Sequence, residues 1–304
     1  SGDESWGKGV NDVNDHELFW VEKGKGKGKG KKGKPWQGGK GIPCGPNSSW
    51  SLIGNRALSS KTGAADVLTQ LGVNLDCKME LVQSSMNEAG ICFLMAPRHH
   101  TAMRHVADTR IQLATRTIFN LLGPIANPAD VTRQLVGVFS QDWVEPVAKV
   151  LKSLGSERAW VVHGSDGLDE ITTTGKTKVA SLEDGAVTIF EIHPSEAGIK
   201  LAKPEQLVGG EPEENANALL SIFNGERNAY RDIVVLNSAA CLIIAGKAKN
   251  LTEGASIASN MIDNGKAMEK LGAIRQTVPA SEVYTLISRG AVDACLLYTS
   301  DAAD

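Results

Sequence analysis

Two adjacent acidic residues, Asp169 and Glu170, follow the apolar segment RAWVVHG at 158–164. That segment predicts a buried strand, and α/β proteins place their ligands at the carboxyl ends of such strands. Mg²⁺ prefers oxygen ligands and is commonly held by one or two carboxylates together with substrate phosphates. Asp169 and Glu170 are therefore candidate magnesium ligands, although an Asp-Glu dipeptide alone is more often a surface turn. His163, at the strand end, is expected to be a structural hydrogen-bonding residue.

A small, polar and glycine-rich segment, GNRALSSKTGAAD at 54–66, has the composition of a phosphate-binding loop. Gly54 permits a tight turn, Ser59 and Ser60 bring hydroxyl groups, and Lys61 brings a positive charge. A helical pattern begins near Ala65, and the amino end of a helix favours anions. Taken alone, such a segment is more often an ordinary capped loop.

The segment RTIFNLLGPIANP at 116–128 closes with a glycine and two prolines. These residues predict a loop held in one conformation, with Pro124 fixing the backbone. We expect this loop to form a rigid wall of a binding site.

The order of the expected elements predicts an α/β fold. Strand RQLVGVFS, helix VEPVAKVLKSLG and strand RAWVVHG follow one another, and continuous apolar strands in this order are typical of a parallel sheet with both faces covered. Further elements are predicted: helices in GAADVLTQLGV, in KMELVQSSMNEAG ending at Gly90 and from about 100 to 113, a strand in ICFLMAP, a β-pair around 183–185, and helices from Pro212 onward. We therefore expect a mostly parallel sheet flanked by helices, with a helical cluster beside it.

Composition limits the classes of protein that remain. Residues 1–50 contain nine lysines, six carboxylates and a Gly/Lys repeat, which predicts a low-complexity, disordered segment. The other 254 residues carry a net charge of −6, which disfavours nucleic-acid binding. Five cysteines without a C-x-x-C spacing favour a reducing compartment. No apolar run is long enough to predict a membrane span.

In their order along the chain, the segments at 54–66, 116–128 and 163–172 resemble the anthranilate phosphoribosyltransferases, over about residues 54–278. The resemblance implies transfer of a phosphoribosyl group from phosphoribosyl pyrophosphate (PRPP) to anthranilate, in tryptophan biosynthesis. It implies a phosphoribosyltransferase-like α/β fold, Mg²⁺ held by Asp169 and Glu170, and anthranilate held by Asn55 and Arg110. On sequence alone, Arg104 and Arg116 rival Arg110. The resemblance implies that PRPP binds along the loop at Gly54, Asn55, Arg56, Ala57, Leu58, Ser59 and Ser60.

The same resemblance implies a homodimer in the cytoplasm, or in the plastid of a photosynthetic eukaryote. It does not extend to the ends, so we expect residues 1–50 and 279–304 to be non-native segments around one α/β domain at 51–278. Leu52 and Ile53 replace a family Lys-His pair, and Ala64 replaces a serine. The family's Gly-Thr-Gly-Gly-Asp loop and much of its N-terminal helical domain do not occur in this chain. Two alternatives remain open: an inactive fragment or binding paralogue, and a pyrimidine nucleoside phosphorylase-like enzyme.

Overall fold

The computed structural model describes residues 50–54, 56, 62–99, 105, 106, 109, 112, 117–127 and 131–275 of the chain. The low-complexity segment predicted at 1–50, apart from Trp50, and the tail predicted at 279–304 lie outside these residues. So does most of the helix predicted at about 100–113. The predicted boundaries of the α/β domain therefore remain predictions.

Four strands form the larger sheet in the order β3-β4-β5-β6. Their bounds are β3 Arg133–Gly137, β4 Arg158–Gly164, β5 Thr177–Glu183 and β6 Ala186–Ile192. Strands β3 and β4 are parallel and are joined through α6 (Val144–Ser153), which confirms the predicted strand-helix-strand unit. Strands β5 and β6 form the predicted antiparallel pair, and its turn contains Asp184 and Gly185, with φ values of 49° and 73°. Strand β5 is also antiparallel to β4, so this sheet is mixed, whereas the sequence predicted a mostly parallel one.

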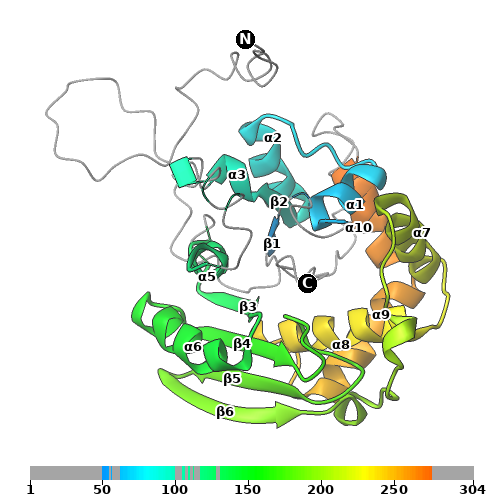
Figure 1. The fold of residues 1–304 in the computed structure, drawn as a ribbon. Coiled ribbons are helices and arrows are strands. Elements are labelled where there is room, and N and C mark those ends of the chain that lie inside the picture. The colour runs from blue at the N-terminus through cyan, green and yellow to red at the C-terminus, as the bar shows by residue number, and fades with distance from the viewer. Residues whose placement is uncertain are drawn as a thin grey trace, which may run out of the picture.

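Both faces of this sheet are covered, because alternate side chains of β4 point to opposite sides. Val161 packs in one apolar cluster with Leu151 of α6. Trp160 and Val162 pack in another cluster with Leu236 of α8 (Ala229–Ile244). Each fully buried side chain of this size contributes about 1.5–3 kcal/mol to folding. Figure 1 shows the resulting α/β/α arrangement, with α6 on one side of the strands and α8 on the other.

A second, two-stranded sheet contains β1 (Trp50–Gly54) and β2 (Ile91–Met95), which are parallel. The connecting chain forms α1 (Ala64–Gln70) and α2 (Met79–Ser84), and α2 runs into a π-helical turn that ends at Gly90 with φ 74°. Strand β2 and the two helices were predicted, including the glycine that ends the second helix, whereas β1 was not predicted. Among the described residues β1 pairs only with β2 and β3 only with β4, so the two sheets are separate.

The C-terminal part of the described chain is helical, as predicted from Pro212 onward. Its helices are α7 Pro212–Phe223, α8, α9 Leu251–Asp263 and α10 Lys266–Arg275. Helices α8 and α9 pack closely, because a Cβ on Gly254 would lie 2.8 Å from the Cα of Ala239. Helix α7 packs against α1, beside the smaller sheet, and against α8, which covers the larger sheet. Of the helices in the described ranges, none is long and apolar enough to cross a membrane.

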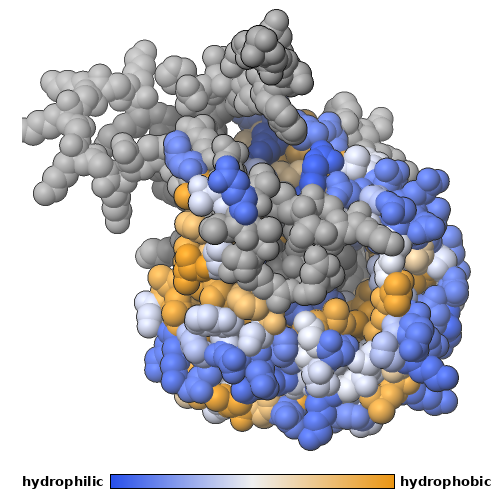
Figure 2. Space-filling view, viewed as in Figure 1, coloured by the Kyte–Doolittle hydropathy of each residue, from blue (hydrophilic) through white to orange (hydrophobic). Residues whose placement is uncertain are grey.

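One prediction was wrong. The segment at 116–128 is not a loop throughout, because Phe119–Ile125 forms helix α5. Pro124 is the sixth of its seven residues, so its missing N–H removes a hydrogen bond only at the carboxyl end of the helix. The N–H of Ala126 donates to the carbonyl of Leu122 at 2.9 Å and closes the last turn. In the space-filling view, apolar side chains reach the surface around α5, where Ile118 and Leu122 are exposed (Figure 2).

Candidate functional site

The acidic pair lies at the carboxyl end of β4, where the sequence predicted it. Asp169 is 3% exposed and Glu170 is partly buried, so neither belongs to a solvated surface turn. The turn folds back on the strand, because the N–H of Gly164 donates to the carbonyl of Leu168 at 2.8 Å. At the same strand end, Nδ1 of His163 lies 2.8 Å from the carbonyl oxygen of Val138. His163 therefore makes the structural hydrogen bond expected of it.

A third carboxylate, Asp166, organises the turn. Its Oδ1 accepts from the N–H of Leu168 at 3.2 Å. Its Oδ2 accepts from the hydroxyls of Thr172 and, at 2.6 Å, Thr174. Hydrogen bonds to a charged acceptor are stronger than those between neutral groups. Asp166 thus joins the residues before the acidic pair to the residues after it.

The electrostatics of the turn are dominated by negative charge. Burial, followed by the charges of Asp169 and Asp166, raises the pKa of Glu170 to about 8. Burial and the charge of Glu170 also raise the pKa of Tyr230, at the start of α8. In the described part of the chain no lysine or arginine forms an ion pair with Glu170. A cation bound here would relieve this repulsion.

Only the two ends of the predicted phosphate loop are described. Gly54 ends β1, and a Cβ there would lie 2.9 Å from the ring of Phe93, so any other residue would require this ring to shift. Arg56 forms ion pairs with Asp66 at 3.5 Å and Asp76 at 3.4 Å. The N–H of Gly63, which caps α1, donates to Asp66 Oδ2 at 3.1 Å. A carboxylate of the chain therefore already accepts a hydrogen bond from this cap.

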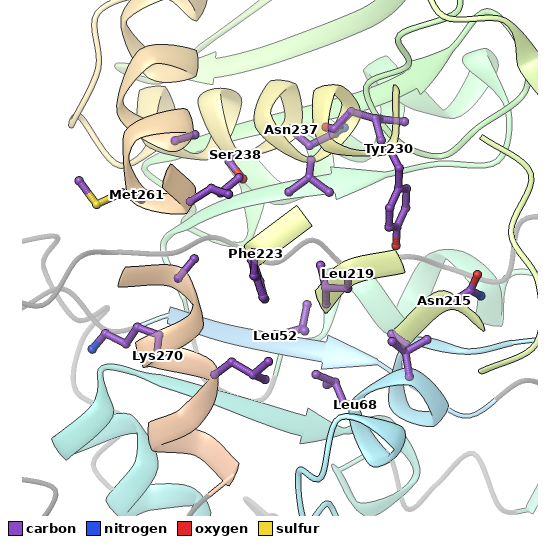
Figure 3. A pocket seen from close by; sticks show the side chains of 18 of the residues that line it. Leu52, Leu68, Asn215, Leu219, Phe223, Tyr230, Asn237, Ser238, Met261 and Lys270 are labelled. Atoms are coloured by element: carbon purple, nitrogen blue, oxygen red, sulfur yellow. The ribbon is translucent and has the colours of Figure 1, made fainter. Parts of the chain in front are cut away.

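The loop end and Glu170, one of the two acidic residues, border one cavity of about 380 Å³. It lies between β1, α1 and the helices α7 to α10, and most of its lining is apolar. In Figure 3 the ring of Tyr230 extends from α8 toward β1. Residues that contribute to its wall include Leu52, Thr62, Gly63, Ala64, Glu170, Asn215, Tyr230, Asn237 and Lys270. Leu52 and Ala64 are two of the three positions where the sequence departs from the resembled family.

Only some of the predicted site residues lie in the part of the chain that the structure describes. The structure brings Glu170 to the same cavity as the end of the phosphate loop. Asn55, Arg110 and the stretch 57–61 lie outside the described residues, so their predicted roles are untested. The sequence analysis did not predict that Tyr230 and Asn237 line the cavity. For Asn237 a signal was available, because it is an asparagine within the apolar sequence of α8.

The fold and the site define a class of protein. The model for the glycosyl transferase family, a/b domain, matches residues 49–268, and the chain belongs to this family. Within it, the chain belongs with the anthranilate phosphoribosyltransferases. The enzyme of that name from Azospirillum brasilense is 62% identical over 214 residues, which cover 70% of this chain and 60% of the relative.

Solved structures agree with this assignment. Anthranilate phosphoribosyltransferase from Thermus thermophilus superposes with a TM-score of 0.68 at 35% identity, covering 83% of this chain and 75% of that one. The Saccharomyces cerevisiae enzyme in complex with PRPP and Mg gives a TM-score of 0.66 at 24% identity, covering 83% of this chain and 71% of that one. The likeness to the yeast enzyme shows the shared fold.

Proposed function

We propose that this chain transfers the phosphoribosyl group of PRPP to the amine of anthranilate, giving N-(5-phosphoribosyl)anthranilate and pyrophosphate. The observation that carries the proposal is that Glu170 and the end of the predicted phosphate loop, at Thr62 and Gly63, border one cavity. The reaction proposed is the one that the anthranilate phosphoribosyltransferases, to which the chain belongs, are named for. The chain spans 60% of the length of the Azospirillum relative, so the activity of the whole enzyme is proposed rather than assigned.

The acidic turn fits a magnesium ion. Asp169 and Glu170 provide oxygen donors. Burial, and after it the charges of Asp169 and Asp166, raise the pKa of Glu170, and a bound divalent cation would offset the repulsion among these carboxylates. Within the described ranges, no three His, Cys, Asp or Glu side chains form a metal cage. Mg²⁺ keeps waters and takes phosphate oxygens besides one or two carboxylates, so the two carboxylates would be sufficient protein ligands. When bound, Mg²⁺ would neutralise charge on the pyrophosphate group; the yeast fold neighbour was solved with PRPP and Mg.

The contributions of the chain itself are positioning and charge. The loop from Gly54 to Ser60 would hold the phosphates through backbone N–H groups and hydroxyls. Arg110 would hold the carboxylate of anthranilate with its planar guanidinium group, and Asn55 would lie near the amine. Holding donor and acceptor in line supplies much of the rate enhancement in such a transfer. We also propose that the enzyme works as a homodimer and acts in the cytoplasm, or in the plastid of a photosynthetic eukaryote.

Loss of anthranilate fluorescence on addition of PRPP and Mg²⁺ tests the proposal. The 304-residue chain is compared with a version that carries a family-type N-terminal segment with the Gly-Thr-Gly-Gly-Asp loop. Glu170→Gln should abolish the signal in whichever version is active. Glu213→Gln, at an exposed position in the first turn of α7, should leave it unchanged.

The possible results distinguish the proposed transferase from the two alternative functions. Activity only in the extended version supports the proposed reaction and shows that the upstream segment is needed. No activity in either version favours an inactive or binding paralogue. Phosphate-dependent release of uracil or thymine from a nucleoside would replace the proposal with a pyrimidine nucleoside phosphorylase.

A further inference from the structure

Asn237 is a fully buried polar residue in the middle of α8. Its neighbours Leu236 and Ala240 belong to the apolar cluster that covers one face of the larger sheet. An amide placed in such surroundings is costly unless its hydrogen bonds are satisfied. The partners of Asn237 therefore show why an amide is retained there.

Two of those partners are the N–H and the C=O of one residue in the acidic turn. Oδ1 of Asn237 accepts from the N–H of Ile171 at 2.9 Å. Nδ2 donates to the carbonyl of Ile171 at 2.8 Å and to the carbonyl of Ile233 at 2.9 Å. The side chain thus pairs with Ile171 much as a neighbouring strand would. The two groups of Ile171 also fix which amide atom is oxygen and which is nitrogen.

Ile171 directly follows the acidic pair and is itself fully buried. The next residue, Thr172, is held from the other side by Asp166. The peptide segment that carries Asp169 and Glu170 is consequently anchored at both ends, by Asp166 at its start and by Asn237 at its end. Carboxylates that hold a cation must be kept in place by such surrounding contacts.

We infer that Asn237 is a positioning residue, which holds the backbone of Ile171 and thereby fixes Asp169 and Glu170 for binding Mg²⁺. This inference rests on the proposed function, because it assumes that the acidic pair binds the metal. The requirement for an amide comes from the turn and not from the helix. A leucine of similar size would suit the apolar cluster but would leave two buried backbone groups of Ile171 without partners.

Asn237→Leu tests the inference, with Leu236→Ala as the matched control. Leu236 is the adjacent residue of α8, is 1% exposed and belongs to the apolar cluster that also contains Ile171, so its truncation removes apolar packing but neither of the two hydrogen bonds to the backbone of Ile171. The first readout is amide hydrogen exchange of Ile171, measured by NMR without metal. We expect exchange at least about tenfold faster in Asn237→Leu than in the control, after correction for global stability.

The second readout is Mn²⁺ affinity in the presence of PRPP, measured by electron paramagnetic resonance. We expect Asn237→Leu to weaken it by about 10–100-fold, as loss of an outer contact to a metal ligand commonly does, and Leu236→Ala to leave it unchanged. Equal affinities in the wild-type chain and Asn237→Leu would overturn the positioning role alone. A wild-type chain that binds no Mn²⁺ would overturn the proposed metal site and the positioning role with it.

The wild-type chain provides a test that does not depend on the variant folding. If Asn237 holds Ile171, the Ile171 amide should exchange only through global unfolding or opening of the whole turn. Exchange as fast as that of an exposed amide would contradict the clamp and overturn the inference.

Discussion

Gly137 ends β3 directly beneath Asp169, and a Cβ on Gly137 would lie 1.5 Å from the carbonyl oxygen of Asp169. The acidic turn after β4 thus rests on the backbone of the neighbouring parallel strand. No side chain fits between them. The position of the acidic pair therefore depends on the residue type at the end of another strand.

Gly137→Ala should displace the turn, because the clash is with backbone atoms that cannot rotate away. We expect a loss of about 1–3 kcal/mol in the free energy of unfolding, measured with urea. The matched control is Gly272→Ala in α10, where an added Cβ meets no atom within 4 Å. That change should be neutral or stabilising by up to about 1 kcal/mol, since alanine favours a helix. Equal effects of the two changes would contradict the close contact at Gly137.

The Glu170 carboxyl predicts a pH dependence of stability. Its pKa is about 8 in the folded chain against an ordinary value of 4.5, so between these values the folded state holds a proton that the unfolded state has released. The free energy of unfolding should then fall as pH rises through this window, by at most about 1.4 kcal/mol per pH unit from this group. Urea titrations of the wild-type chain and Glu170→Gln from pH 5 to 8 measure it.

The difference between those two proteins isolates Glu170 from the other titrating groups. Glu170→Gln should become progressively more stable than the wild-type chain as the pH rises, while Glu213→Gln keeps the wild-type slope. Mg²⁺ competes with the proton, so Mg²⁺ should stabilise the wild-type chain more at pH 8 than at pH 6. A wild-type slope that survives Glu170→Gln would contradict the raised pKa.

The ion pair between α8 and α9 predicts a second stability effect. Nη2 of Arg231, whose side chain is 5% exposed, lies 2.7 Å from Oδ1 of Asp263, whose side chain is 36% exposed. Asp263→Ala would leave the buried guanidinium without this partner. Loss of one partner of a fully buried pair costs about 3–5 kcal/mol, and because Asp263 is partly solvated we expect about 2–3 kcal/mol.

Chemical denaturation of Asp263→Ala beside Glu145→Ala checks this expectation. Glu145 pairs with Lys149 on the exposed face of α6, where such a pair contributes about 0.3–0.5 kcal/mol. Similar losses in the two variants would show that the Arg231 pair is no better shielded than the surface pair.

Thiol reactivity tests the packing of β2. Burial raises the pKa of the Cys92 thiol to about 12 and also raises that of Cys77, which is only half-buried. Because the thiolate is the reactive form, iodoacetamide at pH 8 should label Cys77 much faster than Cys92 in the folded chain. Peptide mapping by mass spectrometry measures both rates. Comparable rates in the folded chain, with equal rates in urea as a reference, would contradict the burial of β2.

The sequence alone determined the elements whose pattern is local. The apolar runs of β3 and β4 flank an amphipathic α6, and short-range spacing is enough to predict a parallel pair with a covered face. It also predicted that Asp169 and Glu170 follow the end of a buried strand, whereas their selection as metal ligands came from the resemblance to the family. It failed at α5, where Pro124 and its neighbouring glycine suggested a loop, although a proline near the end of a helix removes little hydrogen bonding.

Only the tertiary structure decided which distant residues meet. Asn237 lies 66 positions from Ile171, and Thr62 and Glu170 share a cavity across more than a hundred residues. Spacing along a chain carries no information about such contacts, because they depend on how α8 packs on β4 and where β1 and α1 lie against the helices. The sequence thus determined that two carboxylates follow β4, whereas the packing of β3 and α8 against the turn decided where these carboxylates lie.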